Sequence, residues 1–327
     1  MNRRQLLLSG ASLLAAPAHQ PVGAIDIDVA ESPIMNVLRM LPDRKGVNGE
    51  NFAPTSGMNH RIQRNVWPQN PDMYWDPVGD DYHRLLGFRP NAMNLSASYD
   101  GTSISTLDNT QFNDLHSIEM LESHGWEVVD EELRLLHYAG SDDDRLELAE
   151  TLNEMGRPIN EGRWDWICFP DVAHLISGAD EHLVRSIADR VQNFTAMTTI
   201  DSNFHGLRNI LQPAAYSLSL LPPHVLPVKH ATAAYISKTW HGETPIVHSI
   251  GLRLESADQV EPTIEMIRQR MTTEISSSTD TAYADFLEIT DVEIYTSSVR
   301  IDFIDTSDSW NIVQKVDEND LRMLPPG

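Results

Sequence analysis

Four histidines gather in the second half of the chain, at positions 224, 230, 241 and 248. Imidazole nitrogen is a ligand that zinc, copper and iron accept, and histidines on neighbouring strands can converge on one ion. His230, His241 and His248 are therefore the candidate metal ligands. Their spacing matches no metal-binding motif, so exposed or hydrogen-bonded histidines remain the competing interpretation.

A second candidate site is the aromatic loop, residues 67–77, which is stiffened by three prolines. Aromatic faces stack on sugars and other planar ligands, and neighbouring carboxylates can fix hydroxyl groups. Trp67, Tyr74, Trp75 and Asp76 are the candidate ligand-binding residues, with a glycan or an envelope component as the expected partner. The alternative is a loop that pins its aromatic side chains on the core to cover a sheet.

No residue can be assigned a catalytic role from the sequence. Cys168 is the only cysteine, so no intrachain disulfide forms. It lies in the apolar run 164–169, where a buried, inert thiol is expected. The chain contains no nucleophile elbow, phosphate-binding loop, dinucleotide fingerprint or zinc-protease helix motif. Whether the protein is an enzyme, and which cofactor it would use, therefore stay open.

The first residues have the pattern of an export signal. Arg3 and Arg4 precede an apolar run at residues 6–16, and Ala16-Pro17-Ala18 is a small-residue cleavage site. This start resembles the twin-arginine export signal, although Asn2 and Leu6 depart from its usual residues. We expect a signal peptide over residues 1–24 and a periplasmic or extracellular protein. The general secretory route is the alternative.

Composition excludes some partners. A net charge of −24 repels nucleic acid and anionic membrane surfaces, so we expect no nucleic-acid partner. No apolar run of spanning length follows the signal, so no transmembrane helix is expected there. The hydrophobic fraction of 41% suits a globular core.

Hydrophobic periodicity predicts an α+β protein with mixed or antiparallel sheets and helices on one face. Residues 25–100 form an irregular, Pro-rich segment, followed by α+β halves at 101–200 and 201–327. Each half contains an apolar strand, a Ser/Asp turn and an amphipathic helix, so the arrangement resembles two ferredoxin-like halves. Strands are predicted at 103–107, 126–129, 133–138, 164–169, 216–221, 231–237, 246–254 and 292–304.

The mature chain is also similar to uncharacterised exported bacterial proteins. The resemblance is carried by Met40-Leu41-Pro42-Asp43 and by a closing Trp310 with Asp320-Leu321-Arg322-Met323-Leu324. It implies no activity. The leading hypothesis is an exported, non-enzymatic protein that binds a ligand or takes part in an envelope assembly. The alternative is an exported metal-dependent enzyme or hydrolase that uses the histidine-rich strands.

Export has a direct test. The mature protein should begin near His19 or Ile25, and replacement of Arg3 and Arg4 by Lys should block a twin-arginine route. N-terminal sequencing of protein from the native host checks the first point. An intact Met1 in most molecules would refute cleavage, and unchanged export of the Lys variant would favour the general secretory route.

Overall fold

The computed structural model describes residues 33–38, 40–41, 55–61, 87–88, 92–99, 101–108, 110–141, 164–193, 207–221, 226, 228–240, 242, 245–307, 312, 315 and 320–327. All of these residues belong to the unit Glu31–Gly327. The expected signal peptide, residues 1–24, lies outside the described residues.

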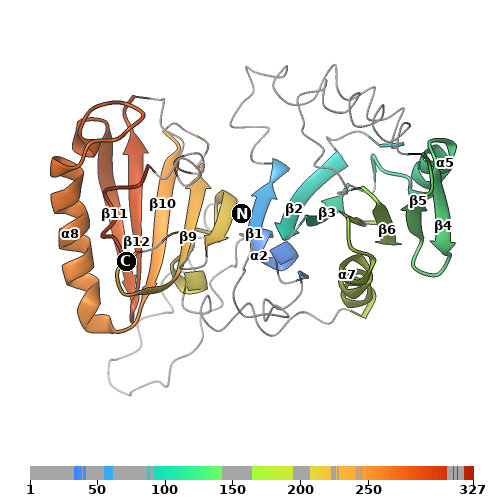
Figure 1. Ribbon diagram of the computed structural model, residues 1–327, viewed down its shortest axis with the longest axis horizontal. Helices are drawn as coiled ribbons and strands as arrows, with labels where there is room; N and C mark the ends of the chain where they lie inside the picture. Colours follow the sequence, from blue (N-terminus) through green and yellow to red (C-terminus); the bar gives the residue numbers. More distant parts are fainter. Residues whose placement is uncertain are drawn as a thin grey trace, which may run out of the picture. The chain divides into compact units, whose positions relative to one another are not determined.

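Helices and strands alternate in small groups along the chain (Figure 1). In chain order the elements are α2 (Pro33–Leu38), β1 (Thr55–Asn59), β2 (Met93–Tyr99), β3 (Thr102–Leu107), α5 (Asp114–Ser123), β4 (Trp126–Asp130), β5 (Leu135–Tyr138), β6 (Trp166–Asp171), β7 (His174–Gly178), α7 (Glu181–Asn193), the 3₁₀ helix η4 (Leu207–Ile210), β8 (Ala215–Leu221), β9 (Ala231–Thr239), β10 (Val247–Leu254), the 3₁₀ turn η5 (Ala257–Gln259), α8 (Val260–Thr273), the 3₁₀ turn η6 (Tyr283–Asp285), β11 (Leu287–Tyr295) and β12 (Ser298–Asp305).

The described strands form one sheet of twelve strands, in the order β11-β12-β10-β9-β8-β1-β2-β3-β7-β6-β5-β4. Every ladder between neighbouring strands of this sheet is antiparallel. The protein is therefore an α+β protein with a large antiparallel sheet, as the sequence pattern predicts.

The strand pairing divides this sheet into two passes, which differ in the number of returning strands. In the first pass β1, β2 and β3 form a meander, α5 crosses over, and β4 to β7 return until β7 pairs with β3. In the second pass β8, β9 and β10 form the meander, α8 crosses over, and β12 returns to pair with β10. The two passes meet where β1 pairs with β8, the first strand of each.

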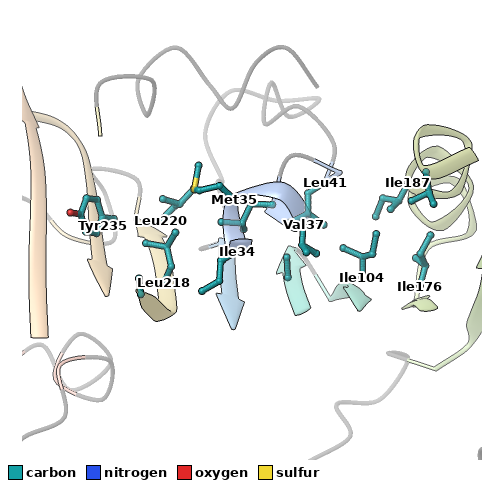
Figure 2. Packing of buried hydrophobic residues seen from close by; sticks show 14 of the residues in the cluster. Ile34, Met35, Val37, Leu41, Ile104, Ile176, Ile187, Leu218, Leu220 and Tyr235 are labelled. Atoms are coloured by element: carbon teal, nitrogen blue, oxygen red, sulfur yellow. The ribbon is translucent and has the colours of Figure 1, made fainter. Parts of the chain in front are cut away.

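The short helix α2 packs against the strands at this junction. Ile34 and Leu38 of α2 are buried, and a Cβ on Gly57 of β1 would overlap the Ile34 side chain. Glycine at position 57 therefore lets the helix approach the sheet closely. Figure 2 shows Ile34 and Met35 of α2 beside Leu218 and Leu220 of β8 within one hydrophobic cluster.

Helices cover both faces of the sheet, which corrects the expectation of helices on one face. On β9, Ala233 and Tyr235 pack in the cluster that contains α2 and α7, whereas Ala234 and Ile236 pack in the cluster that contains α8. Because successive side chains of a strand point to opposite faces, α8 lies on the face opposite α2 and α7. The same alternation at β5 and β6 places α5 opposite α7.

Local capping explains where the helices begin. Asp180 accepts hydrogen bonds from the backbone N–H groups of His182 and Leu183 at 2.8 and 3.3 Å, which caps α7. Ser256 and Gln259 form a capping box directly before α8. The Ser/Asp turns identified in the sequence are therefore helix start signals.

The predicted strand at 292–304 is in fact two strands. Tyr295 of β11 pairs directly with Ser298 of β12, so Thr296 and Ser297 form a two-residue turn. Thr296 has a φ of 53°, a left-handed conformation that β-branched residues rarely adopt. Hairpin turns of this kind are usually marked by Gly or Asn, and neither is present, so the sequence pattern runs through the turn.

Core burial gives the first stability prediction. Ile187 of α7 and Ile267 of α8 are fully buried, as the apolar faces of the two helices predict. Replacing either by Ala should lower the free energy of unfolding by about 2–5 kcal/mol. Leu115→Ala on α5 is the control, because Leu115 is 65% exposed and should cost under about 0.5 kcal/mol. Urea unfolding measures all three, and losses near the control value at both isoleucines would contradict the packing.

Candidate functional site

The aromatic loop cannot be placed in the fold, since Trp67, Tyr74, Trp75 and Asp76 lie outside the described residues. Its candidate role as a ligand platform therefore stays a prediction from sequence.

The structure separates two of the three predicted metal-ligating histidines. His230 lies in the turn before β9, where its Nδ1 is 3.3 Å from Glu255 Oε2. His248 lies on β10 opposite Lys238, six residues along the strand from Leu254, which pairs with Ala231. At about 3.3 Å per residue, that separation is about 20 Å, too far for one ion.

His241 lies outside the described residues. Among the described residues no three His, Cys, Asp or Glu side chains come together as a metal site. The neighbour that the fold gives His248 is instead a lysine.

A row of polar side chains crosses three strands at this point. Ser217 of β8 pairs with Lys238 of β9, and Lys238 pairs with His248 of β10. Directly opposed residues of antiparallel strands point to the same face, with Cβ atoms about 4.5–5.5 Å apart. We call these three residues the basic row. They share the face covered by α8, because His248 pairs with Phe303 of the same hydrophobic cluster.

Burial dominates the electrostatics of the basic row. It lowers the pKa of Lys238 to about 8. Burial and the nearby Lys238 charge lower the pKa of His248 to about 4, against a smaller opposing effect of Asp305. At neutral pH His248 is therefore uncharged, and most Lys238 amines carry a charge. Lys238 makes no hydrogen bond or ion pair to any residue in the described part of the chain.

The basic row was missed in the sequence because its members are 31 residues apart at the extremes and have no motif spacing. One sequence feature could have indicated the basic row. Ala234, Ile236 and Lys238 are every second residue of β9 and share one face, so the lysine interrupts an otherwise apolar face. Only the strand register shows that His248 interrupts the same face of β10 at the same level.

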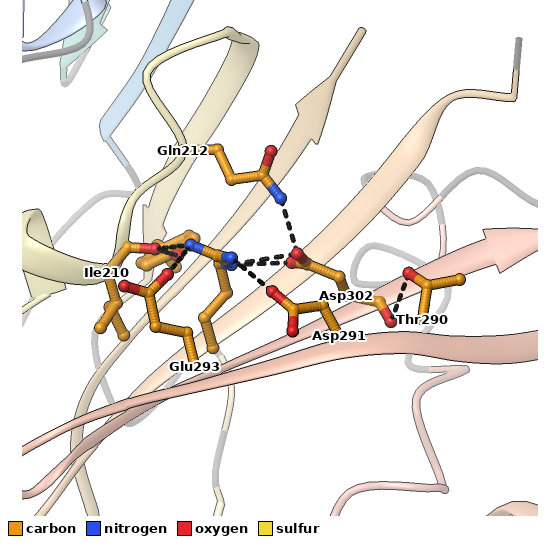
Figure 3. A network of polar contacts seen from close by, with 8 residues as sticks. Ile210, Gln212, Thr290, Asp291, Glu293 and Asp302 are labelled. Carbon is orange, nitrogen blue, oxygen red and sulfur yellow. Dashed lines mark hydrogen bonds and ion pairs between the residues drawn. The ribbon is translucent and has the colours of Figure 1, made fainter. Parts of the chain in front are cut away.

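The opposite face of the same strands carries the Arg300 network, which comprises Arg300, Asp302, Asp291 and Glu293. The Arg300 side chain is 8% exposed and that of Asp302 is 3% exposed. Arg300 Nε donates to both oxygens of Asp302 at 3.0 and 3.1 Å, and Nη2 lies 3.0 Å from Asp291 Oδ2. Nη1 also forms an ion pair with Glu293 (Figure 3).

The 3₁₀ helix η4 closes this network from above the sheet. Its Ile210 carbonyl accepts from Arg300 Nη1 at 2.7 Å and from the Tyr235 hydroxyl at 3.1 Å. Gln212 Nε2 donates to Asp302 Oδ2 at 2.6 Å, and Figure 3 shows its amide directed at that carboxylate. The Tyr235 ring occupies the space above Gly251, where a Cβ would overlap it.

Arg300 is thus held in its charged form by its neighbours. Burial alone would lower its pKa, but the carboxylates of Asp302 and Glu293 outweigh burial and raise it. Three carboxylates and a backbone carbonyl engage Nε, Nη1 and Nη2 of Arg300, so we describe the Arg300 network as a structural ion-pair cluster.

Cys168 is inert, as its apolar surroundings in the sequence predict. Burial, with a smaller effect of Asp130, raises the pKa of its thiol to about 12. The thiol donates to the Leu133 carbonyl at 3.1 Å. A nucleophilic role would require a thiolate, which this environment opposes.

Asp320, part of the closing motif noted in the sequence, is also structural. Its carboxylate accepts from the Ser276 hydroxyl at 2.7 Å, the Ser277 N–H at 2.9 Å and the Tyr283 hydroxyl at 2.7 Å. Burial acts to raise its pKa, but the hydrogen bonds from Ser276, Ser277 and Tyr283 prevail and hold it well below the usual range. The motif therefore ties the C-terminal segment to the loop after α8.

No protein-family model, curated protein or solved structure matches the chain. In the part of the chain that the structure describes, no helix is both long and apolar enough to cross a membrane.

The buried imidazole predicts a pH dependence of stability. The pKa of His248 is about 4 in the folded protein against 6.5 for a free side chain. As the pH falls below about 6.5, the unfolded chain takes up the proton first. The contribution of the neutral, buried His248 to the free energy of unfolding is therefore fully present above about pH 6.5 and is lost as the pH approaches 4. The shift corresponds to a loss of up to about 3 kcal/mol.

The measurement is the free energy of unfolding at pH 7 and pH 4.5, by urea titration. The parent should lose about 2–3 kcal/mol more over this interval than His248→Gln. Leu115→Ala, which changes an exposed side chain without a titratable group, should lose as much stability over this interval as the parent. Equal losses in the parent and His248→Gln would show that the imidazole is not desolvated.

Proposed function

We propose that the protein is an exported, soluble binding protein that acts without catalysis, as a ligand receptor or as a component of an envelope assembly. The single observation that carries the proposal is Lys238, a partly exposed cation for which the described residues supply no counter-ion. An uncompensated charge within an otherwise ordered surface suits recognition of an external group.

The surroundings of Lys238 support binding over chemistry. Other ionisable groups with shifted pKa values in the described part of the chain serve the fold: Arg300 lies in an ion-pair cluster, Asp320 holds a loop, and the Cys168 thiol is buried. A scaffold held in this way keeps a recognition site in one geometry, which lowers the entropy cost of binding.

Export supplies the compartment in this proposal. The signal peptide over residues 1–24 would deliver the chain to the periplasm or the exterior, and the net charge of −24 would keep it soluble there. The aromatic loop would supply a glycan platform, with Trp67, Tyr74 and Trp75 as stacking faces and Asp76 as a hydroxyl acceptor.

We also propose that the chain derives from two ferredoxin-like halves. The twice-repeated path of meander, crossover helix and returning strands supports this origin. In the second pass β10, α8 and β11 form a split unit with β12 between the two strands, as a ferredoxin-like half requires. In the first pass, four strands return where the second pass has two, so that half would have been extended.

Glycan binding is tested by tryptophan fluorescence of the full mature chain with soluble glycans from the host envelope. The parent should give a saturable response, and mass spectrometry should recover the glycans unchanged. Trp75→Ala should keep the parent melting temperature and lose the response, because the change would remove a stacking face and no core contact.

Trp126→Ala is the matched control. Trp126 is buried, and its indole N–H donates to the Trp164 carbonyl at 2.9 Å, so its loss should cost about 3–5 kcal/mol. If Trp75→Ala melts as early as this control and the parent gives no response, the aromatic loop is a structural cover. Time-dependent conversion of the glycans would contradict a non-enzymatic role.

A further inference from the structure

We infer that the basic row, Ser217, Lys238 and His248, binds a carboxylate monoanion. The ligand class goes beyond the proposed envelope role, and the inference shares with the proposed function the unpaired Lys238. The inference therefore rests on the proposed function, but the glycan test uses the aromatic loop and the acetate test uses Lys238, so the two can fail separately.

The first argument is geometric. The register places the three side chains on one face at one level of three consecutive strands. Adjacent Cβ atoms about 4.5–5.5 Å apart give the row a width of about 10 Å. A hydroxyl, an ammonium and an imidazole are each able to donate a hydrogen bond, so an oxyanion beside Lys238 has donors on both sides.

The second argument is the missing counter-charge. Neither Ser217 nor Lys238 has a hydrogen-bond partner among the described residues. Asp305, a carboxylate on this face, accepts from the Ser307 N–H at 2.8 Å and from the Ser307 hydroxyl at 2.7 Å. Arg300, on the opposite face, has three carboxylates. Among the described residues, neither Asp305 nor the carboxylates around Arg300 pair with Lys238.

Charge selects the class of ligand. The row offers one positive charge, and a monoanion would neutralise it without adding charge to a protein of net −24. A phosphate dianion would leave a buried excess charge. A metal cation would be repelled by Lys238. A carboxylate is therefore the best match, whether it belongs to a small acid, an acidic sugar or a peptide terminus.

The small number of lysines makes the test direct. The chain contains four, at positions 45, 229, 238 and 315. In the full mature chain labelled with ¹³Cε-lysine, NMR would follow each one during titration with sodium acetate, with ionic strength held constant by sodium chloride. The Lys238 signal should move saturably, and the signal of Lys229, which is exposed, should not. Lys229→Gln and Lys238→Gln assign the two signals.

Matched variants test the neighbours. Ser217→Ala and His248→Gln should each raise the acetate dissociation constant at least fivefold, and inorganic phosphate at pH 7.5 should bind more weakly than acetate. Thr232→Ala, on the same strand as Lys238 but near its other end, should leave acetate binding unchanged. Circular dichroism confirms that each variant is folded.

Two results would overturn the inference. If the Lys238 signal of the parent moves no more than that of Lys229, the lysine only covers the core. If phosphate binds as tightly as acetate, the site does not select a monoanion. The first result would also remove the observation that carries the proposed function, whereas the glycan response in tryptophan fluorescence would be unaffected by either.

Discussion

The antiparallel register of β9, β10 and β12 decides which charges in the C-terminal half have partners. One face of these strands carries a row of directly opposed residues, Tyr235, Gly251 and Arg300. The other face carries a second row, Lys238, His248 and Phe303. A shift of one residue in any strand would exchange the faces. Arg300 would then point into the core beside α8, and Lys238 would point toward η4.

The two faces differ in whether their buried cation is paired. The desolvation of Arg300 is offset by ion pairs with Asp302, Asp291 and Glu293 and by a hydrogen bond to a backbone carbonyl. The desolvation of Lys238 is not offset by any of the described residues, and the pKa of Lys238 is lowered as a consequence. Removing one member of a buried ion pair leaves its partner uncompensated, whereas removing an unpaired cation leaves nothing behind. This difference is the physical basis for assigning structure to one face and recognition to the other.

Periodicity in the sequence was sufficient for most elements after residue 100 and for the buried faces of α7 and α8, because both depend on residues close in the chain. It missed β1 and β2, which lie in the segment 25–100 that the sequence pattern left irregular. It could not supply long-range pairings such as β1 with β8 or β3 with β7, nor the placement of helices on both faces. Thr296 hides a turn because nothing in its residue type signals a left-handed conformation. His230 and His248 are close in sequence yet lie at opposite ends of a ladder, while Ser217 and His248 are distant in sequence and level in the sheet.

The most direct measurement compares the unfolding free energies of Arg300→Met and Lys238→Met in urea. Arg300→Met should destabilise the protein by about 3–5 kcal/mol, because it leaves the buried Asp302 carboxylate without its cation. Lys238→Met should leave the stability unchanged or raise it, since it removes a desolvated charge with no partner. A loss in Lys238→Met as large as that in Arg300→Met would contradict the account, because it would mean that the lysine is already paired within the fold.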